Sequence, residues 1–169
     1  MQSYSRLISS PIGEISIISS ANGICRVELI NAEESSKQRR LQTLLGQTPM
    51  IFKIHLDEAE RWLEVFFDNP KNLPSPPELD LSSGGEFAQK VWRLLASSEV
   101  GETFNYSEIA SALDNPKASR AVGTAMANNP LPLLVPCHRV LPKSGDLGNY
   151  SALGGVKTKQ WLLTHESPP

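Results

Sequence analysis

Cysteine and histidine are scarce in this 169-residue chain, which has two cysteines and three histidines. Two cysteines cannot build the disulfide framework of a small secreted domain, so a reducing cytoplasm is the expected compartment. The cysteines lie far apart, and no pair has the spacing of zinc ligands, so we expect no metal site.

Long apolar runs are also missing. None approaches the roughly 20 residues of a membrane span, and the start, MQSYSRLISS, lacks the basic and apolar parts of a signal peptide. With 40% hydrophobic and 20% charged residues, the composition is that of an ordinary globular protein. This length suits one large domain or two small ones.

Acidic residues are absent from positions 115–145, although the net charge of the chain is -2. The same stretch contains Lys117, Arg120, Arg139 and Lys143. A mildly acidic protein can therefore carry a locally basic zone, which would suit a nucleic acid.

The first third of the sequence reads as strands. Three stretches rich in Ile, Val and Leu, at 3–10, 13–20 and 23–30, are separated by the turn signals SPIG and SANG. This pattern predicts a three-stranded antiparallel meander. The stretch 57–67, DEAERWLEVFF, has an acidic start and one apolar face, and predicts a helix.

A domain boundary is expected in the next segment, residues 68–85, which contains four prolines and ends in a glycine pair. We interpret it as a linker without regular structure. The predicted class is α+β: residues 1–80 form a small sheet-plus-helix domain, and residues 81–169 form a helical domain.

Helical periodicity follows the linker. Residues 85–99 predict one helix, and TFNYSEIASAL and PKASRAVGTAMANN predict two short ones, the second beginning at Pro116. The short pair is a helix-turn-helix candidate, although two packed helices of an α-helical domain fit the pattern equally well. GVKTKQWLLTHE, residues 155–166, predicts the last helix.

The second helix of the pair is unusually thin. Ala118, Ala121, Gly123 and Ala125 are small, and Arg120 is its main long basic side chain apart from Lys117. Helices that read bases carry several Asn, Gln, Arg or Lys residues. If this helix touches DNA, it should bind backbone and shape, with Arg120 either inserted into the base stack or simply solvated.

Cys137 and His138 are adjacent at the end of an apolar run. A thiol becomes a nucleophile as the thiolate, and His138 could take its proton through a water molecule, with Glu166 orienting the imidazole. The alternative is a buried cysteine beside a structural histidine. Cys25, within a predicted strand, is expected in the core, and His55, just before a predicted helix, is expected to have a local structural role.

Several motifs resemble one family in the same order. They are FAQKVW, GETFNYSEIA, NPKASRAVGTAMANNP, NPLPLLV followed by PCHRV, GNYS and KQWLLTHE, between Phe87 and Glu166. This arrangement resembles the O6-alkylguanine-DNA alkyltransferases, also called methylated-DNA–protein-cysteine methyltransferases. The N-terminal third matches that family only in its layout.

The resemblance implies irreversible transfer of an alkyl group from guanine O6 to Cys137, with His138 as base, Glu166 as its holder and Tyr106 assisting both base flipping and proton transfer. It implies a monomer without a cofactor that acts on double-stranded DNA containing alkylated bases, with O4-alkylthymine left open as a second substrate. The resemblance also assigns three further groups of residues. It implies DNA contact for Lys117, Ala118, Arg120 and Ala121, and a hinge at Asn129. It implies a base pocket lined by Val140, Tyr150, Ser151 and Lys159.

Some features depart from the family pattern. The segment YSALGGVKTK is longer than in many members, which leaves the accepted alkyl size open, and the N-terminal zinc site of some members has no ligands here. Two alternatives remain: a protein that binds alkylated DNA without repairing it, and a cysteine hydrolase. Cys137 argues against the first, and the helix pair with Arg120 has no role in the second.

Overall fold

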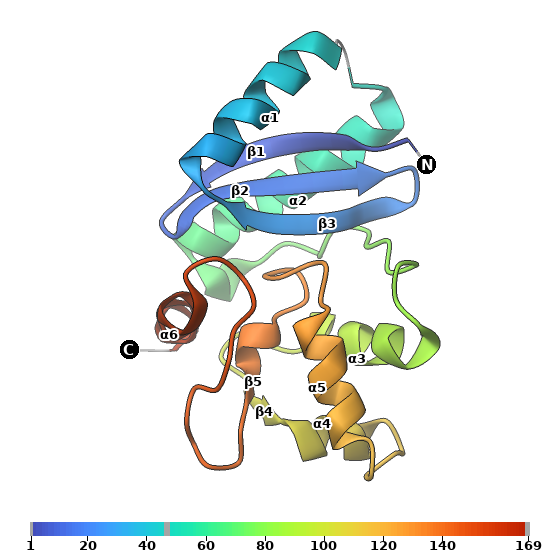
Figure 1. The fold of residues 1–169 in the computed structure, drawn as a ribbon, viewed down its shortest axis with the longest axis vertical. Coiled ribbons are helices and arrows are strands. Elements are labelled where there is room, and N and C mark those ends of the chain that lie inside the picture. Colours follow the sequence, from blue (N-terminus) through green and yellow to red (C-terminus); the bar gives the residue numbers. More distant parts are fainter. Residues whose placement is uncertain (1, 46–47, 168–169) are drawn as a thin grey trace. The chain divides into compact units, whose positions relative to one another are not determined.

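The computed structural model describes residues 2–45 and 48–167. Contacts divide the chain into two compact units, Met1–Asp80 and Leu81–Pro169. The first contains a three-stranded antiparallel sheet with helices, and the second is mainly helical (Figure 1), which confirms the predicted α+β class. Among the described residues, each helix is either too short or too polar to span a membrane.

The sheet of the first unit is the predicted meander. Its strands are β1 (Tyr4–Ser10), β2 (Gly13–Ser20) and β3 (Gly23–Ile30), in the order β1-β2-β3. Gly23 opens β3 with φ +138°, and a Cβ there would lie 2.6 Å from the Glu78 carbonyl oxygen. Glycine is therefore needed at this turn both for its backbone conformation and for the close approach.

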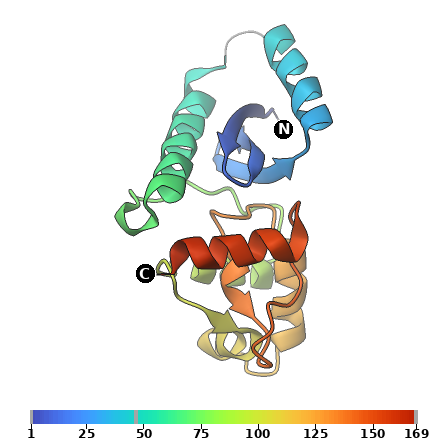
Figure 2. The same ribbon diagram turned by 90° about the vertical axis from the view of Figure 1, so that its left-hand side faces the viewer.

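Two helices lie on opposite faces of this sheet (Figure 2). α2 (Met50–Asp68) begins earlier than the predicted 57–67, so His55 lies inside the helix rather than before it. The side chains that α2 buries are all apolar: Phe52, Leu56, Ala59, Trp62, Leu63 and Phe66. Because successive strand residues alternate faces, Ile15 and Ile17 are buried on the other side of β2 from Ser16.

α1 (Ala32–Leu45) is absent from the sequence prediction. α1 packs on the sheet through polar contacts, such as the hydrogen bond from Gln38 Nε2 to Ser16 Oγ at 2.6 Å. Its sequence therefore lacks the regular spacing of apolar residues that marks a packed helix. Its start does carry a signal. Asn31 and Glu34 exchange side-chain and backbone hydrogen bonds at 3.0 and 3.2 Å, which is a capping box readable from the spacing Asn-x-x-Glu.

The proline-rich segment is not wholly irregular, so the prediction of a structureless linker is partly wrong. It contains a 3₁₀ turn, η1 (Pro70–Asn72), and Leu79 forms a β-bridge with Ile24. The unpaired edge of β3 supplies the hydrogen-bonding groups, since Ile24 N donates to Glu78 O and Asp80 N to Ile24 O, each at 2.8 Å. Cys25 is half-buried with its thiol on Ile18 O, so the expected core position is also wrong.

The second unit contains α3 (Glu86–Ala96), α4 (Tyr106–Ala112), α5 (Ser119–Ala127) and α6 (Gly155–Glu166). Trp92 Nε1 on α3 donates to the Ala125 carbonyl at 2.9 Å and fixes α5 against α3. α5 begins at Ser119, whereas Pro116, predicted as its start, lies in the preceding turn. β4 (Phe104–Asn105) and β5 (Val140–Leu141) form a short parallel pair.

Candidate active site

Cys137 begins a buried 3₁₀ turn, η2 (Cys137–Arg139), directly after a proline. Pro136 has φ -76° and ψ 67°, and the Cys137 amide donates to the Val135 carbonyl at 2.8 Å. These values define an inverse γ-turn, whose φ the proline ring favours by itself. The proline before Cys137 therefore sets the bend that presents the thiol.

Asn129 holds the loop between α5 and Cys137. Its Nδ2 donates to Val135 O at 2.8 Å, and its Oδ1 accepts from Leu131 N at 2.9 Å. Inside this loop Leu133 is buried with φ 77°, a left-handed conformation that is costly for any residue with a Cβ atom. The Asn129 side chain thus fastens both ends of a strained apolar loop at the position predicted as a hinge.

The short parallel pair brings Tyr106 and the cysteine turn together. Phe104 pairs with Val140 and Asn105 with Leu141. Tyr106 directly follows β4, and Arg139, the last residue of η2, directly precedes β5. Asn105 also caps α4 through a capping box with Glu108, which fixes the start of the helix that carries Tyr106.

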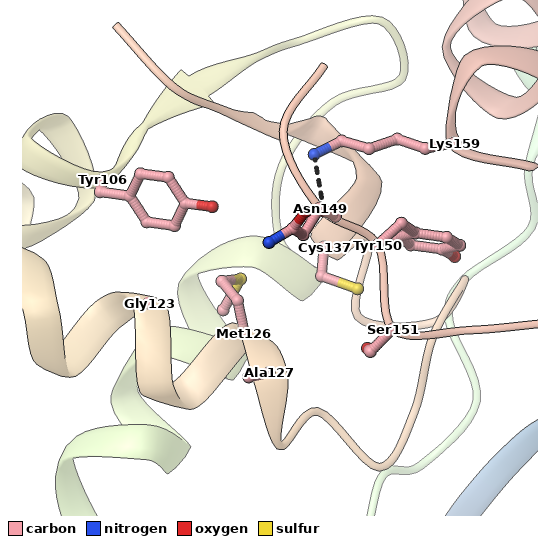
Figure 3. Close-up of a pocket in the computed structure, with 9 residues that line it drawn as sticks. All are labelled: Tyr106, Gly123, Met126, Ala127, Cys137, Asn149, Tyr150, Ser151 and Lys159. Carbon is pink, nitrogen blue, oxygen red and sulfur yellow. Dashed lines mark hydrogen bonds between the residues drawn. The ribbon is translucent and has the colours of Figure 1, made fainter. Parts of the chain in front are cut away.

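A cavity of about 230 Å³ opens beside Cys137 (Figure 3). Gly123 lies against the Tyr106 ring, where an added Cβ would come within 3.9 Å of Cε1. Val140, predicted as a pocket residue, is not among the lining residues; its side chain is buried, and its carbonyl accepts from Lys159 Nζ. The lining residues are Tyr106, Gly123, Met126, Ala127, Cys137, Asn149, Tyr150, Ser151 and Lys159.

Asn149 is a polar residue of the cavity lining that the sequence did not lead us to predict. It stands within the quoted GNYS motif, so the signal was present, but only Tyr150 and Ser151 of that motif were assigned to the pocket. Gly123, Met126 and Ala127 were missed as well, because which face of α5 meets the cavity depends on tertiary packing.

His138, the residue after Cys137, forms a buried pair with Glu166. His138 Nε2 lies 2.7 Å from Glu166 Oε1, and neither side chain is open to solvent. Arg139 binds the same carboxylate through Nε at 2.8 Å and Nη2 at 3.0 Å, and Gly101 N adds a bond at 3.2 Å. Glu166 is therefore shared between the histidine and a bidentate arginine.

Protonation in this network follows from burial and hydrogen bonding. Burial raises the pKa of Glu166, but the hydrogen bonds from His138 and Arg139 outweigh it and bring the pKa to about 2. Burial lowers the pKa of His138 despite its bond to Glu166, so the imidazole is neutral at pH 7. Since a carboxylate faces Nε2, the proton resides there, which leaves Nδ1 as an acceptor.

The Nδ1 atom of His138 is buried and has no hydrogen-bond partner in the described part of the chain. Burial also raises the pKa of the neighbouring Cys137 thiol, and the hydrogen bond from Asn129 and the charge of Lys159 offset this only in part. The site at rest therefore combines a neutral thiol with a base ready to accept a proton.

Lys159 is buried on α6, although lysine is seldom buried without a carboxylate partner. Its Nζ donates to Val140 O at 2.7 Å and Asn149 O at 3.4 Å. Burial lowers its pKa, while Cys137 acts in the opposite direction. The ammonium thus ties the segment around Asn149 to the strand after Cys137 and places a cation beside the thiol.

The predicted DNA-contact residues lie on or just before α5. Arg120 and Ala121 are exposed on the helix, Lys117 is exposed in the preceding turn, and Ala118 is half-exposed. Val122, Ala125 and Met126 form the buried face. The outward face of α5 is therefore thin, with one arginine near its start.

Comparison with known proteins identifies this arrangement. The family described as 6-O-methylguanine DNA methyltransferase, DNA binding domain, matches residues 86–168. The methylated-DNA–protein-cysteine methyltransferase of Cricetulus griseus is 37% identical over 95% of this chain and 80% of its own length, and that of Homo sapiens 34% over 94% and 78%. The chain belongs to the methylated-DNA–protein-cysteine methyltransferase family. A crystal structure of Mycobacterium tuberculosis OGT in complex with DNA is 32% identical, with a TM-score of 0.73 over 96% of this chain and 91% of that one.

Family membership confirms the resemblance carried by PCHRV, GNYS and the neighbouring motifs. Among residues 2–45 and 48–167, no cluster of three or more His, Cys, Asp or Glu side chains could hold a metal ion.

The Glu166 network predicts a specific loss of stability in acid. Because the pKa of Glu166 is about 2 in the folded protein and near 4.5 when exposed, its charge stabilises the fold above pH 4.5. That contribution, about 3 kcal/mol, is lost as the pH falls through 4.5 towards 2. Urea unfolding of wild type and Glu166→Gln should differ most near neutral pH and converge over this window. A gap that does not change with pH would contradict the ionised, buried carboxylate.

Proposed function

We propose that this protein repairs DNA by moving an alkyl group from O6 of guanine to Sγ of Cys137. The observation that carries the proposal is the thiol at the cavity wall, followed in the chain by His138, whose imidazole is paired with the buried Glu166. A cavity of about 230 Å³ is smaller than most drug-sized ligand sites and suits a single extrahelical base.

The proposed reaction needs no cofactor. The thiol proton passes through water to Nδ1 of His138, and the thiolate attacks the alkyl carbon. The S–C bond forms as the C–O6 bond breaks, and the electron pair stays on the base, which takes a proton with the help of Tyr106. The products are a thioether on Cys137 and undamaged guanine. A thioether has no easy leaving group, so each molecule acts once.

Glu166 acts in this scheme as a fixed negative charge. With its pKa held at about 2 it does not take up the proton, but it stabilises the imidazolium that forms when His138 does. The positive charge of Lys159 favours the thiolate form of Cys137. Burial alone would leave the thiol inert, and these two groups favour the charges that develop during transfer.

DNA would be bound by the thin face of α5 in the minor groove. Small residues such as Ala118 and Ala121 allow a close approach, Lys117 would contact phosphate, and Arg120 would fill the gap left by the flipped nucleotide. Tyr106 would assist flipping from the neighbouring helix, and Asn129 would act as the hinge between α5 and the cysteine loop. We further propose that the protein works as a monomer in the cytoplasm, where its nucleophilic thiol stays reduced.

Incubation with duplex DNA carrying O6-methylguanine, followed by mass measurement of the intact protein, tests this function. A mass increase of one methyl group on Cys137 supports repair. DNA binding without a mass change would support a non-transferring binding protein instead. Neither binding nor transfer would leave a cysteine hydrolase as the better hypothesis.

Replacing Arg120 with alanine should separate base flipping from chemistry. Repair in duplex DNA is expected to fall by roughly 10- to 100-fold, because an extrahelical base costs a few kcal/mol without a stacking substitute. Reaction with free O6-benzylguanine should stay near wild type, since a free base needs no flipping. Arg93→Ala, which removes an exposed arginine of α3, is the matched control. Equal losses on both substrates would show that Arg120 shapes the pocket.

A further inference from the structure

We propose that Asn149 distinguishes O6-alkylated from undamaged guanine by donating its side-chain amide to N1 of the flipped base. The inference rests on the function proposed above. Asn149 lines the cavity together with Cys137 and Tyr106. Figure 3 shows its amide group directed into the space between Tyr106 and Cys137.

The backbone of Asn149 is held in place from two sides. Its carbonyl accepts from Lys159 Nζ at 3.4 Å, and the same ammonium is anchored on Val140 O at 2.7 Å. Gly148, with φ +65°, packs so closely on Pro142 that an added Cβ would lie 2.9 Å from Cγ. These contacts hold the backbone from which the exposed Asn149 side chain extends into the cavity. A backbone that is already ordered lowers the entropy cost of placing the amide on a bound base.

The side-chain amide of Asn149 is available for hydrogen bonding to a ligand. Within residues 2–45 and 48–167 it has no hydrogen-bond partner, whereas the nearby Lys159 ammonium is occupied by two carbonyls. A primary amide offers two donors and an acceptor side by side. It is thus suited to a ligand edge on which an acceptor and a donor are adjacent.

Alkylation creates that edge. In undamaged guanine N1 carries a proton, so N1 and the 2-amino group are both donors. When O6 is alkylated, N1 loses its proton and becomes an acceptor beside the 2-amino donor. Asn149 could then donate to N1 and accept from the amino group at the same time. Undamaged guanine presents two donors, so only the amide oxygen could pair and the amide NH₂ would face an N–H group. O4-alkylthymine has the acceptor but no adjacent donor, so the contact favours alkylguanine.

The test compares transfer from O6-methylguanine and from its 1-deaza analogue, in which C–H replaces N1, in the same duplex. The readout is the single-turnover rate of Cys137 methylation. Asn149→Leu gives the intrinsic reactivity ratio of the two bases, because leucine cannot donate. The wild-type ratio should exceed the variant ratio by up to about tenfold, the upper range of the net contribution of one hydrogen bond. Asn22→Leu, an exposed asparagine of the first unit, should keep the wild-type ratio.

Equal ratios in wild type and Asn149→Leu would overturn the proposal, even if the variant were slow, because a residue that only positions the loop slows both substrates alike. Asn149→Asp adds a second check: an acceptor-only carboxylate faces the N1 lone pair and should slow O6-methylguanine more than leucine does. Wild-type protein that methylates Cys137 from neither base would refute the repair function itself, a result distinct from equal ratios.

Discussion

Cys137→Ala is expected to abolish alkyl transfer completely while leaving binding to duplex DNA close to wild type. The sulfur atom is the only group in the proposed reaction that forms a bond to the alkyl carbon, so no residual route remains. The basic side chains expected at DNA, Lys117 and Arg120, belong to α5 and its preceding turn. The change from a buried thiol to a methyl group removes little volume, so the fold should persist.

Two measurements separate alkyl transfer from DNA binding. Intact-protein mass after incubation with O6-methylguanine DNA reports transfer, and a binding titration at several salt concentrations reports affinity. Cys25→Ala, at the half-buried thiol of the first unit, is the control and should transfer normally. Binding by Cys137→Ala should weaken with salt, because phosphate contacts release counterions. A folded Cys137→Ala protein that binds DNA as poorly as it repairs would contradict the assignment.

Elements with strong local signals were predictable from the sequence. The three strands alternate apolar residues between clear turn signals, and the last helix, Gly155–Glu166, matches its predicted range residue for residue. α1 was missed because it binds the sheet through polar side chains, so the apolar period that marks a packed helix is weak. Pro116 favoured too early a start for α5, since proline fits a turn as well as a first helical residue.

The candidate site was less predictable because it depends on contacts between distant segments. The pairing of Phe104 with Val140 joins residues far apart in sequence through backbone atoms, and backbone pairing leaves no side-chain pattern. The inverse γ-turn at Pro136 and the sharing of Glu166 with Arg139 likewise need coordinates. Residue types suggested a Cys, His and Glu assembly, and the geometry adds a neutral histidine, an ionised glutamate and a buried lysine.

Glu166→Gln should slow alkyl transfer by roughly 10- to 100-fold, part of the usual worth of a positioned base. Glutamine keeps the shape but removes the charge that stabilises the His138 imidazolium, and it can turn an NH₂ group towards Nε2 and favour the wrong tautomer. In wild type, transfer should continue near pH 7 and fall only below pH 6.5, because burial lowers the pKa of His138. DNA affinity should change little, since Glu166 ends α6 and lies apart from α5 in sequence.

The comparison needs folded protein, because removing the carboxylate leaves Arg139 buried without its partner, and breaking a buried pair costs about 3–5 kcal/mol. Circular dichroism and urea unfolding establish that state before rates are compared. Glu86→Gln, which neutralises an exposed carboxylate on α3, controls for the loss of one charge. If folded Glu166→Gln transfers at the wild-type rate, the triad assignment is wrong. Cys137 would then owe its reactivity to the positive charges of Lys159 and Arg139 rather than to a base held by Glu166.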